Sequence, residues 1–172
     1  TRHGLKDATN DREKVTRWWQ RMPDAKVAAP AGPENGFLVL DLDVDEEKGV
    51  NGLSWLAAME ARWGQLPRGP RSRTPRGGVH LFFKYPADRA VRNSAGKIAP
   101  GVDVRGDGGY VVLAPSQLPN GEYLSEVSPF DCELPDAPNW LLNLVCEGPL
   151  PPPETGALAV LEQPLTEADQ AA

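Results

Sequence analysis

The segment Phe37-Leu-Val-Leu-Asp-Leu-Asp-Val-Asp45 constrains the fold more than any other stretch of the chain. Successive side chains of a β-strand point to opposite faces, so the three leucines share one face while Asp41 and Asp43 share the other. The Cα atoms of the two acids are then expected roughly 6.5–7 Å apart. Carboxylates at that spacing can converge on two divalent cations, and without cations or a raised pKa they would repel each other. The segment predicts a buried strand with an acidic site on its polar face.

A pair of glycines followed by a histidine indicates a second strand, in Thr74-Pro-Arg-Gly-Gly-Val-His80. His80 alternates with apolar residues and is expected on the face away from them. Gly77 and Gly78 would let a bulky ligand approach the backbone N–H groups, and Arg76 adds a cation close by. These groups suit a phosphate, although a Gly-Gly turn followed by a structural histidine explains the same residues.

A third strand is expected at Gly101-Val-Asp-Val-Arg105, with Asp103 and Arg105 on one face and two valines on the other. Asp103 would supply the third carboxylate of a two-metal site. Arg105 could hold a phosphate oxygen or form an ion pair with Asp103. An exposed Asp–Arg strand face is the alternative, and it is common when such a segment is taken alone.

Other interpretations of the Asp-x-Asp-x-Asp pattern stay open on these residues. A calcium loop would need glycine at its sixth position, where Glu46 stands. A phosphohydrolase of the haloacid-dehalogenase type would use Asp41 as its nucleophile, but it usually has Thr or Val at the position of Asp45. A plain acidic strand end also fits.

Hydrophobic periodicity predicts helices over residues 9–22, 52–63 and 138–147, and strands over 36–44, 79–85, 102–104 and 110–113. We expect basic loops over 65–75 and 86–100 and a turn at Asn120-Gly121. The strands and helices do not alternate regularly, which favours an α+β fold over a doubly wound sheet. We expect one domain over residues 1–147, followed by a Pro-rich linker and tail over 148–172.

Composition and charge say less about function than these three segments do. The net charge is −6, but residues 68–105 hold nine basic and two acidic residues, so a polyanion could bind if the fold gathers these cations on one face. The candidates for nucleic-acid contact are Arg71, Arg73, Arg92 and Lys97. The two cysteines lie far apart and far from either histidine, so no zinc is expected, and no apolar run is long enough to cross a membrane. A reducing cytoplasm is the simplest expectation.

The chain resembles the bifunctional primase–polymerase (prim-pol) family of the archaeo-eukaryotic primase superfamily. The matching segments, in order, are Gly36-Phe-Leu-Val-Leu-Asp-Leu-Asp-Val44, Thr74-Pro-Arg-Gly-Gly-Val-His-Leu-Phe-Phe83, and the stretch from Arg92 to Ser116 around Gly101-Val-Asp-Val-Arg105. The resemblance covers roughly residues 1–147. It implies a mixed, mainly antiparallel central sheet flanked by helices, with an RRM-like catalytic core. The chain starts later than is usual in the family and lacks an initiator Met, so we expect a truncated N-terminus.

By that resemblance, Asp41, Asp43 and Asp103 would bind two Mg²⁺ or Mn²⁺ ions, and His80 would contact the phosphates of an incoming nucleotide. The same-face geometry adds Arg76 and Arg105 as further triphosphate contacts. The implied function is DNA primase or polymerase activity on a single-stranded template with a primer strand and NTP or dNTP, in a bacterial, plasmid or phage replication protein that also carries or recruits a helicase. A prim-pol-like module that binds origins or single-stranded DNA without synthesis is the alternative.

Overall fold

The computed structural model describes residues 3–129 and 131–146 of the 172-residue chain. The helical elements are η1 (Gly4–Asp7), α1 (Arg12–Arg21), α2 (Gly52–Trp63) and α3 (Asn139–Cys146). The strands are β1 (Ala28–Pro30), β2 (Phe37–Leu42), β3 (Val44–Asp45), β4 (Val50–Asn51), β5 (Arg71–Arg73), β6 (Val79–Lys84), β7 (Ser94–Ala99), β8 (Val102–Arg105), β9 (Tyr110–Val112), β10 (Gln117–Leu118), β11 (Gly121–Glu122) and β12 (Leu124–Val127).

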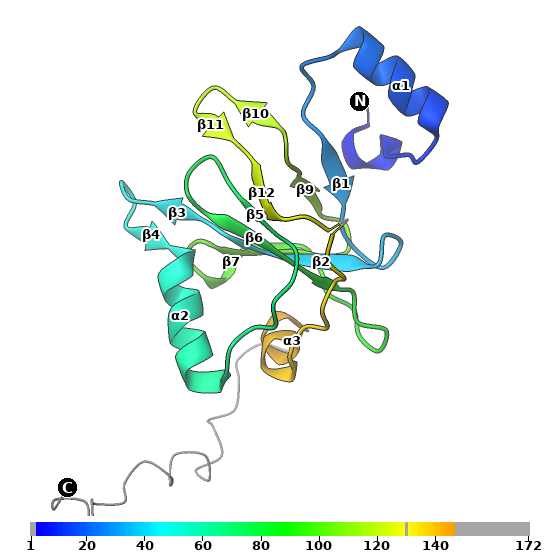
Figure 1. Ribbon diagram of the computed structural model, residues 1–172. Helices are drawn as coiled ribbons and strands as arrows, with labels where there is room; N and C mark the ends of the chain where they lie inside the picture. The colour runs from blue at the N-terminus through cyan, green and yellow to red at the C-terminus, as the bar shows by residue number, and fades with distance from the viewer. Residues whose placement is uncertain (1–2, 130, 147–172) are drawn as a thin grey trace, which may run out of the picture.

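A six-stranded antiparallel sheet in the order β12-β5-β6-β2-β8-β7 forms the centre of the molecule, and three two-stranded pairs, β1–β9, β10–β11 and β3–β4, surround it. Helices α2 and α3 lie on the same side of the sheet, while α1 lies apart from them, next to β1 (Figure 1). The expected α+β class with an antiparallel central sheet is confirmed.

The leucine face of β2 carries the main core. Leu38, Leu40 and Leu42 are fully buried in one cluster with Val102, Val104 and Leu141, and partly buried side chains of α2 and α3 pack against it. Burial of these aliphatic side chains fixes the register, because a one-residue slip would turn the leucines outward and the carboxylates into the core.

The opposite face of the sheet is only partly covered. Val39 of β2, Phe82 of β6 and Val111 of β9 form a second, smaller cluster there. The β1–β9 pair therefore covers one end of this face, and Asp41 lies towards the other end, where two cavities adjoin it.

The predicted helices and strands are present with small differences in their bounds, whereas β5, β7 and β12 were not predicted. The helix expected over residues 9–22 is shorter, because the Asp11 side chain accepts hydrogen bonds from the backbone N–H groups of Glu13 and Lys14 and caps the helix there. The turn expected at Asn120-Gly121 is confirmed, and it joins β10 to β11 in a hairpin.

The two segments expected as basic loops each contain a strand, β5 in residues 65–75 and β7 in residues 86–100. Hydrophobicity does not mark these strands, since Ser72 is the one buried residue of β5 and β7 has none. Their pairing with β6 and β8 is what makes them strands.

The predicted tail, residues 148–172, lies outside the described residues. Within the described residues, none of the helices has the length and the apolar character that crossing a membrane requires.

Candidate functional site

The register of the three central strands brings the predicted acids together. Asp41 of β2 lies directly opposite Asp103 of β8 on one side and His80 of β6 on the other. Asp43 is the first residue after β2 and lies on the same face as Asp41. One carboxylate oxygen from each of Asp41, Asp43 and Asp103 lies within 4.8 Å of the others. Three residues that are far apart in the sequence thus form one acidic cluster.

The Arg105 guanidinium bridges two of these carboxylates. Its Nε and Nη2 donate to Asp41 Oδ2 at 3.1 and 2.8 Å, and Nη2 also donates to Asp103 Oδ2 at 2.8 Å. The other oxygen of Asp103 accepts a hydrogen bond of 2.8 Å from the backbone N–H of Gly96 in β7. Both acids are therefore held in fixed positions, and Arg105 offsets part of their charge.

His80 completes the cluster from the other neighbouring strand. Its Nε2 lies 3.2 Å from Asp41 Oδ1, a distance that gives an ion pair when the imidazole is protonated. Within the described part of the chain, His80 Nδ1 is buried and has no hydrogen-bond partner. A buried polar atom without a partner is costly, so this nitrogen indicates a ligand that would satisfy it.

The electrostatic environment shifts the pKa values of Asp41 and Asp43 in opposite directions. Burial raises the pKa of Asp41, but the contacts with His80 and Arg105 outweigh it and hold that pKa below its ordinary value. For Asp43, burial and the negative charges of Asp41 and Asp103 raise the pKa. The Arg105 pKa is raised, because its bonds to Asp41 and the nearby acids outweigh the effect of burial. The cluster thus carries more negative charge than its one guanidinium balances.

The donor set fits a hard divalent cation. Mg²⁺ and Mn²⁺ prefer carboxylate oxygens, and three of them face a common point here. A cation at this point would offset the negative charges of Asp41 and Asp103, which contribute to the raised pKa of Asp43.

Two cavities adjoin the cluster and share Asp41, His80, Arg105 and Tyr123. One, of about 300 Å³, is also lined by Asp43, Thr74, Arg76 and Asn120. The other, of about 260 Å³, is lined by Asn93 and by the β9 region from Gly108 to Val112. Arg76 therefore lies on the Asp43 side of the cluster.

The two glycines before His80 differ in what surrounds them. Gly77 has a φ of +81° and open space where a Cβ would lie, whereas a Cβ on Gly78 would collide with the carbonyl oxygen of Leu42. Gly78 thus lets β6 approach the end of β2, and the open backbone that a ligand could approach is at Gly77.

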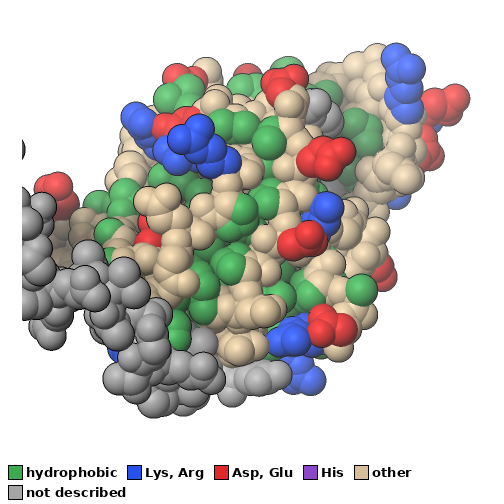
Figure 2. Space-filling model, turned by 60° about the horizontal axis from the view of Figure 1, so that its bottom comes forward, with side chains coloured by type: hydrophobic (Ala, Val, Ile, Leu, Met, Phe, Trp, Pro, Cys, Tyr) green, Lys and Arg blue, Asp and Glu red, His purple; other side chains and the backbone are tan. Residues whose placement is uncertain are grey.

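The four basic residues predicted to contact nucleic acid do not join the cluster. Arg71 and Arg73 lie opposite Leu81 and Val79, on the leucine face of the sheet, and both bond to Glu126 of β12. Arg92 and Lys97 are exposed and line a separate cavity beside α3. In the view of Figure 2, Lys and Arg side chains form separate small groups with acidic side chains among them, rather than one stripe.

Sequence reasoning missed Tyr123. Its ring lies 5.6 Å from the His80 ring, centroid to centroid, and it lines both cavities. It follows the β10–β11 hairpin, where nothing in the local pattern indicates a site. The hairpin lies against Pro75, in the segment before β6, and this tertiary packing brings Tyr123 to His80.

Comparison with known proteins gives one finding that agrees with this geometry. No curated protein matches the chain. A family model does match, that of the N-terminal domain of the bifunctional DNA primase/polymerases, and it spans residues 1–140, a range that contains every residue of the acidic cluster. The chain belongs to the bifunctional DNA primase/polymerase (Prim-Pol) family.

Proposed function

We propose that this domain catalyses template-dependent nucleotidyl transfer, joining an NTP or dNTP to the 3′-hydroxyl of a primer on single-stranded DNA with release of pyrophosphate. The observation that carries the proposal is the convergence of Asp41, Asp43 and Asp103 within 4.8 Å, beside the buried His80 Nδ1, which has no hydrogen-bond partner among the described residues. Membership of the Prim-Pol family supports DNA and nucleotides as the substrates.

In this proposal the three carboxylates hold two Mg²⁺ or Mn²⁺ ions. When bound, such ions lower the pKa of an attacking hydroxyl and neutralise charge that develops on the phosphates. The hydrogen bond from the Gly96 backbone N–H holds Asp103 in place before any ligand arrives, so this acid needs little reorganisation on binding.

The charged side chains around the acids suit a triphosphate. Arg76 lines the cavity on the Asp43 side, and the open backbone at Gly77 lies next to it in the chain. His80 Nδ1 is available as a hydrogen-bond donor or acceptor. Arg105 can turn its guanidinium from the acids to a phosphate oxygen, since both are good partners for it. These three side chains would orient the triphosphate for in-line attack.

The other cavity would take the sugar and base. It is lined by Gly108 and Gly109 and by the start of β9. Gly108 has open space where a Cβ would lie, so a nucleotide could approach the main chain closely there, whereas the Asn93 side chain fills that space at Gly109.

The test is primer extension on a single-stranded DNA template with Mg²⁺ or Mn²⁺. We expect the wild-type domain to extend the primer and Asp43→Asn to lose extension without losing its fold, because the Asp43 side chain makes no hydrogen bond within the described residues and its negative charge lies close to those of Asp41 and Asp103. Asp45→Asn is the matched control: it lies two residues further on, outside the cluster, paired with Lys48, and should keep extension.

The same experiment separates the alternatives. DNA binding without any synthesis would favour a non-catalytic origin-binding or single-strand-binding module. Release of phosphate from a simple monoester, abolished by Asp41→Asn and without elongation, would favour a phosphohydrolase. Extension by Asp43→Asn at the wild-type rate would contradict the proposed metal site.

A further inference from the structure

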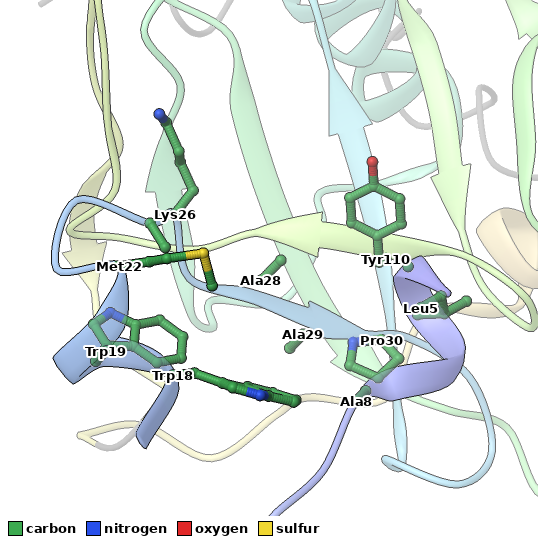
Figure 3. Close-up of a pocket in the computed structure, with 12 residues that line it drawn as sticks. Leu5, Ala8, Trp18, Trp19, Met22, Lys26, Ala28, Ala29, Pro30 and Tyr110 are labelled. Carbon is green, nitrogen blue, oxygen red and sulfur yellow. The ribbon is translucent and has the colours of Figure 1, made fainter. Parts of the chain in front are cut away.

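An apolar groove lies between the N-terminal elements and the β1–β9 pair. It has a volume of about 430 Å³ and is lined by η1, α1, β1 and the first residue of β9. In Figure 3, Trp18, Trp19 and Met22 of the α1 region reach towards Ala28 and Ala29 of β1. The size is that of a site for a nucleotide or another small planar ligand.

The groove is not filled by the part of the chain that the structure describes. Helix α1 has no buried residue, although Trp18 and Trp19 lie on its inner side. Met22, at the end of the helix, is 49% exposed, and Tyr110 is 56% exposed. Large apolar and aromatic side chains that stay exposed around one hollow indicate a binding surface.

The groove adjoins the candidate active site. Tyr110 lines both the groove and the cavity that contains Asp41, His80 and Arg105. Tyr110 also pairs with Pro30 in the β1–β9 ladder, and Pro30 lines the groove. The groove and the candidate active site therefore meet at Tyr110.

The charges around the groove favour a polyanion. Residues 3–30 hold six basic and four acidic residues, whereas the whole chain has a net charge of −6. Lys26 lines the groove, and Lys14 Nζ lies 5.3 Å from the centre of the Trp18 ring. Aromatic rings interleaved with cations are the usual arrangement for single-stranded nucleic acid, in which bases stack on the rings and phosphates contact the cations.

We propose that this groove binds an unpaired base of single-stranded DNA next to the active site, by stacking on the Trp18 side chain, with Lys26 near the adjacent phosphate. The choice of DNA rests on the proposed function; the choice of an unpaired base rests on the aromatic lining and the neighbouring cations. The groove would then hold the template strand on the β9 side of the acidic cluster.

The test is the affinity for a fluorescently labelled oligodeoxythymidylate in EDTA, where no synthesis occurs. We expect Trp18→Leu to weaken binding by about 5- to 100-fold, the loss typical for one stacked base. Trp63→Leu is the matched control, because Trp63 also lies beneath a cation, Arg62 at 5.1 Å, but belongs to α2 on the leucine face; it should bind as the wild type does.

Two further variants distinguish a loss of oligonucleotide binding from a loss of folding. Met22→Glu places a negative charge at an exposed position, so it should weaken binding with an unchanged circular dichroism spectrum. Lys26→Gln should reduce the slope of log affinity against log salt by about 0.7, the value for one phosphate contact on a single strand.

The outcomes separate this inference from the proposed function. Asp43→Asn should lose extension and keep its oligonucleotide affinity, and a loss of affinity in the groove variants would support the inference even if the wild type showed no extension. Wild-type affinity in both Trp18→Leu and Met22→Glu would overturn the inference and leave the proposed function standing. A wild-type dimer that Met22→Glu dissociates, seen by sedimentation, would also overturn it, because a second copy would then cover the groove.

Discussion

Arg105 is the one guanidinium bonded to the acidic cluster in the described residues, so its removal should destabilise the metal-free protein. Arg105→Met keeps most of the aliphatic stem and removes three hydrogen bonds to Asp41 and Asp103. The side chains of the two acids are 9% and 13% exposed, and that of Arg105 is 25% exposed. Breaking a fully buried ion pair costs about 3–5 kcal/mol. Since solvent reaches a quarter of Arg105, we expect a loss of about 2–3 kcal/mol in the free energy of unfolding.

The assay is urea denaturation at pH 7, in EDTA and in Mn²⁺. A cation bound at the cluster supplies positive charge where the guanidinium was, so Mn²⁺ should restore much of the stability lost in Arg105→Met. Binding at one hundred times its dissociation constant adds about 2.7 kcal/mol. The variant should gain more from Mn²⁺ than the wild type gains, because no guanidinium competes for the carboxylate oxygens.

The control is Arg73→Met, which removes an exposed arginine paired with Glu126 on the opposite face of the sheet. It should lose little stability and show no response to Mn²⁺ beyond that of the wild type. An Arg105→Met variant that is as stable as the wild type in EDTA, or whose loss is the same with and without Mn²⁺, would refute the reasoning.

Three further predictions concern the site and the core. Because the pKa of Asp43 is raised in the folded protein, its ionised form costs stability above that pKa, and the cost disappears as pH falls through it. Asp43→Asn should therefore stabilise the metal-free protein at neutral pH, with a gain that shrinks on acidification; urea titrations at several pH values test this, and a gain independent of pH would count against it. Gly78→Ala should disrupt the pairing of β6 with β2 and lower Mn²⁺ affinity, since its Cβ would collide with the Leu42 carbonyl, whereas Gly77→Ala, at a φ of +81° in open space, should cost only about 1–2 kcal/mol of stability and leave Mn²⁺ affinity nearly unchanged. Isothermal titration with Mn²⁺ separates the two, and equal affinities would be evidence against the steric argument. Leu141→Ala, at a fully buried position of α3, should lower the free energy of unfolding by about 2–5 kcal/mol in urea, and a loss under 1 kcal/mol would mean that α3 is not part of the main core.

The sequence was most informative where one strand carries both a core face and a polar face. The alternation from Leu38 to Asp43 predicted the strand, its buried side and the shared face of the two acids, because a period of two has few other structural explanations. The same reasoning placed Asp103 and Arg105 on a common face, which the structure has.

What the sequence could not predict is which strands are neighbours and how surface strands form. β5 and β7 pair through backbone groups that every sequence carries, so the polar residues of those strands look like loops. The position of Tyr123 against His80 depends on the packing of a hairpin, and the separation of Arg71 from the acids depends on the register of β5. Both are properties of the tertiary structure rather than of local pattern.

Asp41, His80 and Asp103 lie on β2, β6 and β8, and these strands also supply the centre of the main core. Local fluctuations that free a loop would not disturb such a cluster, because separating Asp41 from Asp103 means pulling apart the ladder that the whole domain depends on. The domain should therefore keep its cation affinity up to its melting temperature and lose cation binding only when the whole domain unfolds. Amide protons of these strands should correspondingly exchange only through global opening.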